Sequence, residues 1–350
     1  MSRVAGKAIY EVCKERGDNL EIFSMYDHSS DVDTRYFPRE VFKGFAARKL
    51  PFVARSVRRG IHCDVVVLSH INLLLAGFLI KLFSPKTQLI LLAHGIEAWE
   101  KFSSRKRKML MHCDQILAVS EFTRNTMIQN GLQESIFSVL NNCLDPFLKE
   151  PHTDEKSELL LERYGFKRED IVLMTLTRLA AKERYKGYDI VIESLNKLRD
   201  DFPVLRYLIV GKYDKEEKSR LDKMITTYGL KDRVVFAGFI PDEEVAAHFN
   251  IADIYIMPSE KEGFGIVFIE AMYYNKPVIA GNKDGSVDAL LHGKLGLLVN
   301  PNSEEEITEA IKQTICYRKK YIPDHQLLMD HFSFPVYKDK WREVLGSRLC

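Results

Sequence analysis

The stretch Pro258-Ser-Glu-Lys-Glu-Gly-Phe-Gly-Ile-Val-Phe-Ile-Glu-Ala-Met272 decides the fold of this 350-residue chain. A short apolar run, Ile254-Tyr-Ile-Met257, stands before it and is typical of a buried parallel strand that ends at a proline. A helix is expected to begin near Phe264 or Gly265. The loop between strand and helix therefore lies where a helix N-terminus offers free backbone N–H groups to an anion such as a phosphate or diphosphate.

Two carboxylates flank this loop, Glu262 within it and Glu270 inside the expected helix. A phosphate would repel both, so we expect them to face away from the anion. A carboxylate is well suited to accept two hydrogen bonds from the vicinal hydroxyls of a ribose or a hexose. A diphosphate with a diol at each end describes a nucleotide sugar. The alternative is an ordinary strand–loop–helix unit with surface glutamates.

The same stretch closely resembles the Glu-x7-Glu motif of the retaining glycosyltransferases of family four, which have the GT-B fold. Each half of the motif alone is a weak signal, but strand, proline, Glu-Gly-Phe-Gly and helix-borne Glu together are a strong one. The resemblance spans nearly the whole chain. It implies an α/β architecture of two Rossmann-like, doubly wound parallel-sheet domains with a cleft between them.

The expected domains are an N-terminal acceptor-side domain over residues 1–147 and a C-terminal nucleotide-sugar-binding domain over residues 158–330. A polar segment around Pro151 is the expected linker. A final helix within residues 331–350 is expected to cross back to the first domain. Independently of the resemblance, apolar strand patterns alternate with helical patterns along both halves, for example a strand over residues 88–93 and a helix over residues 188–198, and a turn is expected over residues 281–286. The alternation predicts parallel sheets covered by helices.

Two cations, Arg178 and Lys186, are expected to lie close to the anion site. Arg178 follows an expected strand, and Lys186 precedes Gly187 and an expected helix, so both should converge on the loop near Gly263. The resemblance implies that both cations bind the donor diphosphate. Two fixed positive charges would offset the charge that grows on the leaving diphosphate without a metal.

The resemblance also assigns roles to further residues. His94, at the carboxyl end of an expected strand, would contact the transferred sugar at the reaction centre; the alternative is a structural histidine that caps the next helix. Glu262 would hold the sugar hydroxyls and Glu270 the ribose. Main-chain groups at Phe239 and Ile240 would meet the base. The other donor-binding positions are Gly263, Phe264, Gly265, Ile266 and Val267, and the backbone of the last three completes the anion site.

The implied reaction moves a hexose from a UDP- or GDP-linked donor to a glycan or lipid-linked acceptor, with retention of anomeric configuration. The expected course is same-face attack, in which the leaving phosphate takes the acceptor's proton. No cofactor and no metal are expected. The family suggests bacterial surface polysaccharide synthesis in the cytoplasm, at the inner face of the cytoplasmic membrane. Two other hypotheses stay open: a catalytically impaired GT-B protein that binds nucleotide or a partner, and a sugar-nucleotide epimerase on the same fold.

The beginning of the chain departs from the family's pattern. Residues 2–16 predict a helix and residues 21–26 a strand, whereas a doubly wound domain normally begins with a strand and a glycine-rich turn. We therefore expect the first, central strand and its turn to be missing. Either the coding sequence starts further upstream or the protein is a degraded member, which keeps the impaired alternative open.

Residues 39–59 mix aromatic and apolar side chains with several cations, and 105–108 form a second basic cluster. Basic amphipathic helices can lie on anionic membrane surfaces; a helix packed on its own sheet with a solvated basic face is an equal alternative. No nucleic-acid-binding motif accompanies the charge, so no nucleic acid partner is expected. Asp31-Val-Asp33 matches the metal-binding Asp-x-Asp of GT-A enzymes, but it follows polar residues, and a solvated loop is expected.

Overall fold

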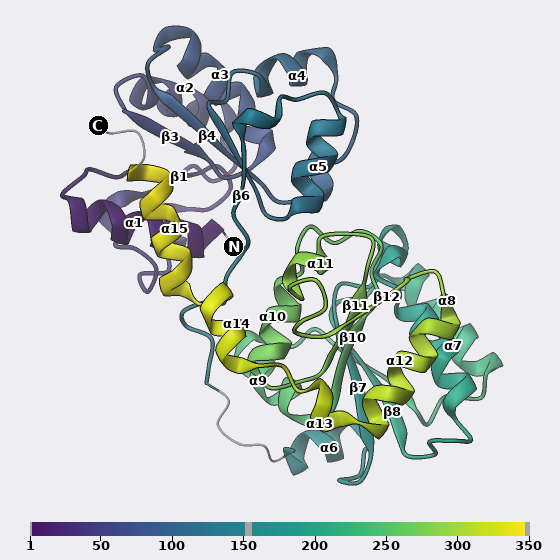
Figure 1. The fold of residues 1–350 in the computed structure, drawn as a ribbon. Coiled ribbons are helices and arrows are strands. Elements are labelled where there is room, and N and C mark those ends of the chain that lie inside the picture. The colour runs from purple at the N-terminus through teal and green to yellow at the C-terminus, as the bar shows by residue number, and fades with distance from the viewer. Residues whose placement is uncertain (1, 151–155, 347–350) are drawn as a thin grey trace. The chain divides into compact units, whose positions relative to one another are not determined.

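The computed structural model describes residues 2–150 and 156–346, and the chain divides into two compact units. The first unit comprises Met1–Pro146 together with Phe332–Cys350, and the second comprises Phe147–His331. Both are built from parallel strands and surrounding helices (Figure 1). Among the residues described, no helix combines the length and the apolar character needed to cross a bilayer.

The second unit holds one six-stranded parallel sheet in the order β12-β11-β10-β7-β8-β9. Its strands are β7 (Ile171–Leu176), β8 (Leu205–Val210), β9 (Val234–Gly238), β10 (Ile254–Met257), β11 (Val278–Gly281) and β12 (Leu297–Val299). Every residue of β10 and β11 is buried. Helices on both faces explain why these strands are continuous apolar runs rather than alternating ones.

Helices cover both faces of this sheet (Figure 1). One face packs against α7 (Tyr188–Leu198), α8 (Lys215–Thr227) and α12 (Glu304–Cys316). On the other face, Tyr255 of β10 contacts the rings of Phe249 in α9 (Asp242–Ile251) and Phe268 in α10 (Ile266–Tyr273). Shorter helices complete this part of the chain: α6 (Glu158–Tyr164), η6 (Ala181–Lys186), α11 (Ser286–Ala289), α13 (Arg318–Tyr321) and α14 (His325–Phe332).

The sheet of the first unit is divided. The strands β3 (Val65–Leu68), β4 (Gln88–Ala93), β5 (Gln115–Ala118) and β6 (Phe137–Val139) form a four-stranded parallel sheet in chain order. Among the residues that the structure describes, the strands β1 (Ile22–Ser24) and β2 (Phe42–Gly44) pair only with each other. β3 therefore has a strand neighbour on one side alone, and three of its four residues are half-buried.

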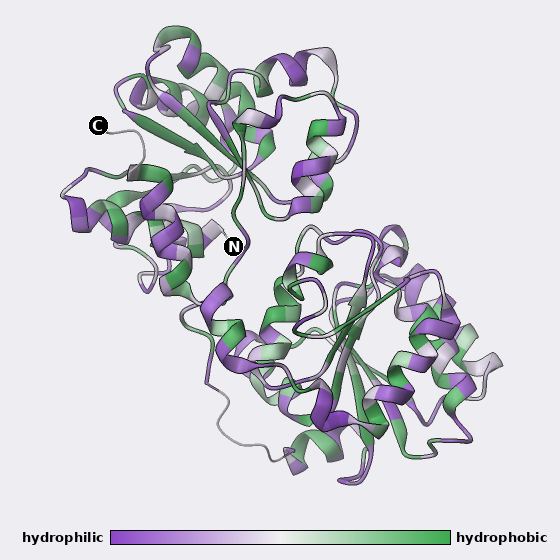
Figure 2. Cartoon of the chain, viewed as in Figure 1, coloured by the Kyte–Doolittle hydropathy of each residue, from purple (hydrophilic) through white to green (hydrophobic). Residues whose placement is uncertain are grey.

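Alternate residues of β4 serve two cores in the first unit. Ile90 and Leu92 pack against α1 (Ser2–Arg16) and α15 (Phe334–Gly346), where Trp341 is fully buried. Leu89 and Leu91 face the opposite core, to which three helices contribute: α3 (Leu74–Phe83), α4 (Ser104–Leu110) and α5 (Glu121–Gln129). Figure 2 shows the resulting pattern, with hydrophobic strands and helices of mixed character.

The segment 39–59 corrects one prediction, because it is not a single helix. It consists of η2 (Arg39–Val41), β2 and then α2 (Lys49–Gly60). Phe45 and Phe52 are 4% and 5% exposed, so these aromatic side chains pack inside their own unit. Phe52 therefore packs α2 against its own unit, and Lys49, Arg58 and Arg59 of the same helix are exposed. Four other short helices lie in this unit: η1 (Ser29–Asp31), η3 (Ile71–Leu73), η4 (Ile96–Ala98) and η5 (Glu134–Ile136).

Asp31 and Asp33 have local partners. Asp33 accepts two hydrogen bonds from Arg35 Nε, at 3.0 and 3.1 Å, and forms an ion pair with its guanidinium. Asp31 accepts a hydrogen bond from the backbone N–H of His28 at 2.8 Å and so fixes the start of η1. The predicted solvated loop is confirmed for this segment.

Candidate functional site

The loop between β10 and α10 forms the centre of the candidate site. α10 begins at Ile266, one or two residues later than the sequence predicts. Gly265 precedes it with φ +82°, and a Cβ there would lie 2.3 Å from a ring carbon of Phe268. This left-handed backbone and the close ring together require a glycine.

Backbone donors are available at the start of α10. The N–H groups of Gly265, Ile266 and Val267 donate to no acceptor within the described residues, whereas Phe268 N–H bonds the Gly265 carbonyl at 3.0 Å. Unsatisfied N–H groups at a helix N-terminus, with the positive end of the helix dipole, favour an anion. The geometry therefore offers three donors to a phosphate group.

Lys186 and Glu262 meet beside these donors. Lys186 Nζ forms an ion pair with Glu262 Oε2, and the two side chains are 13% and 19% exposed. The next residue, Gly187, has φ +75°, and a Cβ there would lie 2.4 Å from the carbonyl oxygen of Pro258. Lys186 is thus held against the end of β10 by an approach that only glycine permits.

Asp284 positions Glu262 and was missed by the sequence analysis. Its Oδ2 accepts the backbone N–H of Glu262 at 2.7 Å, and its Oδ1 accepts that of Ser286 at 2.9 Å. Gly285 N–H donates to the Glu262 carbonyl at 2.8 Å. Burial raises the pKa of Asp284 to about 6. The signal was Asp-Gly-Ser just after a strand, where an Asp side chain commonly bonds the backbone two residues on.

Arg178 follows β7 but has a partner within its own segment. Its guanidinium forms an ion pair with Glu183, and its side chain is 68% exposed. Burial raises the pKa of Tyr185, the charges of Glu183 and Glu262 raise it further, and the charge of Arg178 lowers it. Lys186 Nζ lies 5.5 Å from the ring centroid of the same tyrosine, and of the two cations it is Lys186 that contacts Glu262.

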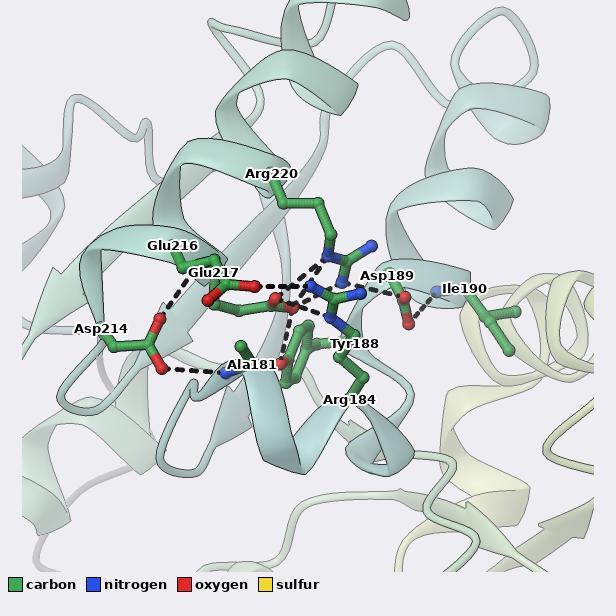
Figure 3. A network of polar contacts seen from close by, with 9 residues as sticks. All are labelled: Ala181, Arg184, Tyr188, Asp189, Ile190, Asp214, Glu216, Glu217 and Arg220. Carbon is green, nitrogen blue, oxygen red and sulfur yellow. Dashed lines mark hydrogen bonds and ion pairs between the residues drawn. The ribbon is translucent and has the colours of Figure 1, made fainter.

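A buried carboxylate anchors the segment that carries Lys186 (Figure 3). Glu217 accepts hydrogen bonds from Arg184 Nε at 3.0 Å, Tyr188 Oη at 2.9 Å and Arg220 Nε at 3.1 Å. Burial raises the pKa of Glu217, but the hydrogen bonds and charges of these partners outweigh burial and bring the pKa below its ordinary value. The partners come from η6, α7 and α8, so the network ties three elements together.

Asp214 extends the same network to the start of η6 (Figure 3). Its Oδ1 accepts the backbone N–H of Glu217 at 2.8 Å and so caps α8. Its Oδ2 accepts the backbone N–H of Ala181 at 2.9 Å. Asp214 thus joins the cap of one helix to the beginning of the segment that ends at Lys186.

Glu270 lies in the middle of α10 and is half-buried. Burial raises the pKa of Tyr255, and the charges of Glu262 and Glu270 raise it further. The Tyr255 hydroxyl itself donates to the Leu176 carbonyl at 3.2 Å, at the end of β7. Both glutamates of the motif therefore act on one buried phenol.

Phe239 and Ile240 follow β9 and differ in exposure. The Phe239 side chain is 66% exposed, and Lys212 Nζ lies 4.7 Å from its ring centroid. Ile240 is 8% exposed and packs inward. The segment thus offers an exposed aromatic ring and a buried anchor next to it.

His94 belongs to the first unit and follows β4. Its Nε2 lies 2.7 Å from the carbonyl oxygen of Ser69, and its backbone N–H donates to Glu97 Oε1 at 2.8 Å. Burial lowers the pKa of His94, which makes the imidazole neutral at pH 7, with Nε2–H as the donor to Ser69. The residue that caps η4 is Gly95, so His94 joins the ends of β3 and β4 and caps no helix.

Comparison with known families accounts for both units. Residues 157–321 match the model described as glycosyl transferases group 1. Residues 9–146 match the model of glycosyltransferase family 4. Each half of the chain thus matches a glycosyltransferase family model, which supports the expected family. The residues of the glutamate motif lie inside the first of these matches.

Curated relatives of this chain are similar to it over part of their length. A GDP-mannose-dependent alpha-(1-6)-phosphatidylinositol monomannoside mannosyltransferase of Mycolicibacterium smegmatis is 31% identical, over 59% of this chain and 54% of that protein. Mannosylfructose-phosphate synthase of Agrobacterium fabrum is 26% identical, over 60% of this chain and 46% of that protein. The chain thus spans about half the length of the curated relatives it matches.

Solved structures show the same fold. Anabaena HepE in complex with UDP and glucose has a TM-score of 0.78 and 22% identity, covering 98% of this chain and 96% of that one. A glycosyltransferase from Rickettsia africae has a TM-score of 0.80 and 19% identity, covering 99% and 94%. The predicted GT-B fold of two Rossmann-like units is confirmed for this chain.

Proposed function

We propose that this chain moves a hexose from a UDP- or GDP-linked sugar to a glycan or lipid-linked acceptor, with retention of configuration. The observation that carries the proposal is the Lys186–Glu262 pair beside the free N–H groups of α10. One loop thereby holds a cation and backbone donors for a diphosphate and a carboxylate for sugar hydroxyls. A GDP-mannose-dependent relative and a structural neighbour that binds UDP and glucose support the same donor class.

The donor diphosphate would bind at the start of α10. Lys186 has three N–H donors, so it can keep its contact with Glu262 while donating to a phosphate oxygen. Arg178 donates to Glu183 through Nε and Nη2, and its other guanidinium N–H groups remain for the diphosphate. Two fixed cations stabilise the charge on the leaving group, so in this proposal the reaction needs no metal.

The transfer is proposed to run by same-face attack. The bond between the anomeric carbon and the diphosphate oxygen breaks, a bond to the acceptor oxygen forms, and the acceptor's proton passes to the leaving phosphate. Glu262 holds the sugar hydroxyls, Glu270 the ribose, and the main chain at Phe239 and Ile240 the base. His94 contacts the transferred sugar. We place this reaction in bacterial surface polysaccharide synthesis, in the cytoplasm at the inner face of the membrane.

A second candidate function is nucleotide binding with little transfer. The observation that favours it is the divided sheet of the first unit, because β1 and β2 do not join the four-stranded sheet. The second unit, which carries the donor residues, is continuous. Such a protein would bind the nucleotide through the second unit alone.

Calorimetry and a transfer assay test both candidates. UDP or GDP should bind equally well with and without EDTA; binding that disappears with EDTA would exclude the metal-free mechanism. Glu262→Gln should reduce sugar transfer at least a hundredfold, because it removes the carboxylate assigned to the sugar. Glu260→Gln, an exposed neighbour in the same loop, is the matched control and should transfer normally. Tight nucleotide binding without transfer by the parent chain would favour the second candidate.

A further inference from the structure

Tyr185 has a hydroxyl group that the folded chain leaves without a partner. Its side chain is half-buried, and its O–H makes no hydrogen bond to another residue within the described ranges 2–150 and 156–346. By contrast, Tyr188, three residues further on, donates its hydroxyl to Glu217 at 2.9 Å. A phenol that is partly withdrawn from water usually bonds a polar group, so the O–H of Tyr185 indicates a group that the chain itself does not supply.

The backbone around Tyr185 is fixed against the loop between β10 and α10. The carbonyl of Tyr185 accepts the N–H of Glu260 at 2.8 Å, which ties it to the loop that carries Glu262. The preceding residue, Arg184, donates to Glu217 at 3.0 Å and so belongs to the buried network of Figure 3. The segment is therefore held on both sides, and it presents the Tyr185 ring beside the candidate donor site.

Three cations from two segments lie near this phenol. The ammonium nitrogen of Lys186 is 5.5 Å from the ring centroid, and that of Lys261, in the loop after β10, is 5.9 Å from it. Arg178 is close enough for its charge to lower the pKa of Tyr185. An O–H donor with positive charges around it is well suited to bind an anion, because the cations and the hydroxyl stabilise the same negative charge.

The hydroxyl of Tyr185 keeps its proton at neutral pH. Burial raises the pKa of Tyr185, the charges of Glu183 and Glu262 raise it further, and together they outweigh the opposite effect of Arg178. The phenol is therefore a neutral hydrogen-bond donor at pH 7. A phosphate oxygen is the acceptor that a neutral O–H donor beside cations favours.

We propose that Tyr185 is a further donor-binding residue, whose hydroxyl donates to the terminal phosphate of the leaving nucleoside diphosphate. The inference rests on the proposed function, in which Lys186 and the N–H groups of α10 hold the diphosphate. Tyr185 directly precedes Lys186, and the charge of Glu262, which is assigned to the sugar, acts on the same phenol. The hydroxyl is therefore assigned to the phosphate that carries the sugar. Negative charge grows on this phosphate as its bond to the sugar breaks, so the hydrogen bond is stronger in the transition state.

Tyr185→Phe in the full chain tests the proposal, because it removes the hydroxyl and keeps the ring. By calorimetry the variant should bind UDP or GDP about tenfold more weakly than the parent chain does. It should bind UMP or GMP as the parent does, because the monophosphate lacks the terminal phosphate. In the transfer assay kcat should fall about tenfold, while KM for the donor changes less than about threefold, since the hydrogen bond strengthens in the transition state.

Tyr228→Phe is the matched control. Tyr228 is also half-buried, and its hydroxyl likewise bonds no other residue in the part of the chain that the structure describes. It follows the last residue of α8, whereas Glu217 lies in the first turn of that helix. Tyr228→Phe should therefore change neither nucleotide binding nor transfer. Thermal unfolding of both variants should match that of the parent chain, because neither substitution removes a hydrogen bond within the described residues.

Three results would overturn this inference and leave the proposed function standing. Unchanged affinity of Tyr185→Phe for the diphosphate, with normal transfer, would mean that the hydroxyl touches no part of the donor. Equal loss of affinity for the monophosphate and the diphosphate would give Tyr185 a structural role. Loss of transfer with unchanged diphosphate affinity would assign the hydroxyl to the sugar. A parent chain that binds neither UDP nor GDP would instead overturn the proposed function, and this inference with it.

Discussion

In the second unit six parallel strands form one sheet, and β10 and β11 are buried along their whole length. In the first unit the sheet is divided into four strands and two, and β3 is half-buried because it has one strand neighbour. The first unit closes its core with α1 and α15, from opposite ends of the chain. The donor residues of the second unit are thus positioned by buried strands and a buried polar network. The core of the first unit depends more on helices for its packing.

The largest effect is expected from removing the network's central carboxylate. Glu217→Ala removes the buried acceptor that Arg220, Arg184 and Tyr188 share and should lower the free energy of unfolding of the second unit by about 3 kcal/mol. Hydrogen exchange of the buried strands measures this loss. Tryptophan fluorescence should be unchanged, because both tryptophans, Trp99 and Trp341, lie in the first unit.

The neighbouring glutamate supplies the control for this comparison. Glu216 is 76% exposed and lies 3.6 Å from Arg184, so Glu216→Ala should change stability by less than about 0.5 kcal/mol. If Glu217→Ala destabilised both units equally, the two units would unfold together, and the proposed difference in how each unit is stabilised would be wrong.

A smaller effect is expected at Gly187. Gly187→Ala places a methyl group against the Pro258 carbonyl and should cost about 2–3 kcal/mol while weakening nucleotide binding about tenfold, because it displaces Lys186. Gly165 has a similar φ of +67° with nothing within 4 Å, so Gly165→Ala should cost only about 1 kcal/mol and leave nucleotide binding intact. If both variants bound nucleotide with the same affinity, the close packing of Gly187 against the Pro258 carbonyl would not be needed to position Lys186 for binding.

The two glutamates of the motif should divide their effects on binding. Glu270→Gln should weaken UDP or GDP binding about tenfold, since Glu270 is assigned to the ribose. Glu262→Gln should leave nucleotide affinity nearly unchanged, since Glu262 is assigned to the sugar. Calorimetry on the two variants makes the comparison, and an equal loss of affinity in both would contradict the division.

A change of pH should alter stability with opposite signs in the two units. The pKa of Asp284 rises from 3.8 to about 6, so its contribution to stability is full below about pH 4 and is lost as pH rises through 6, by at most about 3 kcal/mol. The pKa of His94 lies below 6.5, so its contribution is present above pH 6.5 and is lost as pH falls.

Hydrogen exchange of β10 and tryptophan fluorescence follow the two units separately across this pH range. Asp284→Asn should flatten the slope of the second unit, and His94→Gln should flatten that of the first. Slopes of the same sign in both units would mean that other groups dominate the pH dependence.

Strands and helices with strong local patterns could be predicted from the sequence, and those without could not. The prediction gave α7 as 188–198 and β4 as 88–93, which are their observed bounds, because apolar periodicity and flanking turns mark both elements. It missed β2, a strand of three residues whose pairing with β1 depends on a partner twenty residues away. Such short strands form through tertiary contact rather than through local preference.

The candidate functional site could likewise be predicted only where the sequence carries a local pattern. Lys186 and Glu262 could be named from one motif and one cation, but the contact between them spans 76 residues of chain. Glu217 gave no local signal, because its importance comes from burial among Arg184, Tyr188 and Arg220. Asp284 stood in a segment recognised only as a turn. Residues that position others are identified by their partners, which only the folded chain brings together.

The open edge of β3 has a consequence for handling the protein at high concentration. A strand paired on one side only presents backbone groups to any extended segment that approaches it, including the same edge of another molecule. β1 has a second such edge. Self-association by strand addition is therefore expected to begin in the first unit, and short peptides that compete for these edges should slow it.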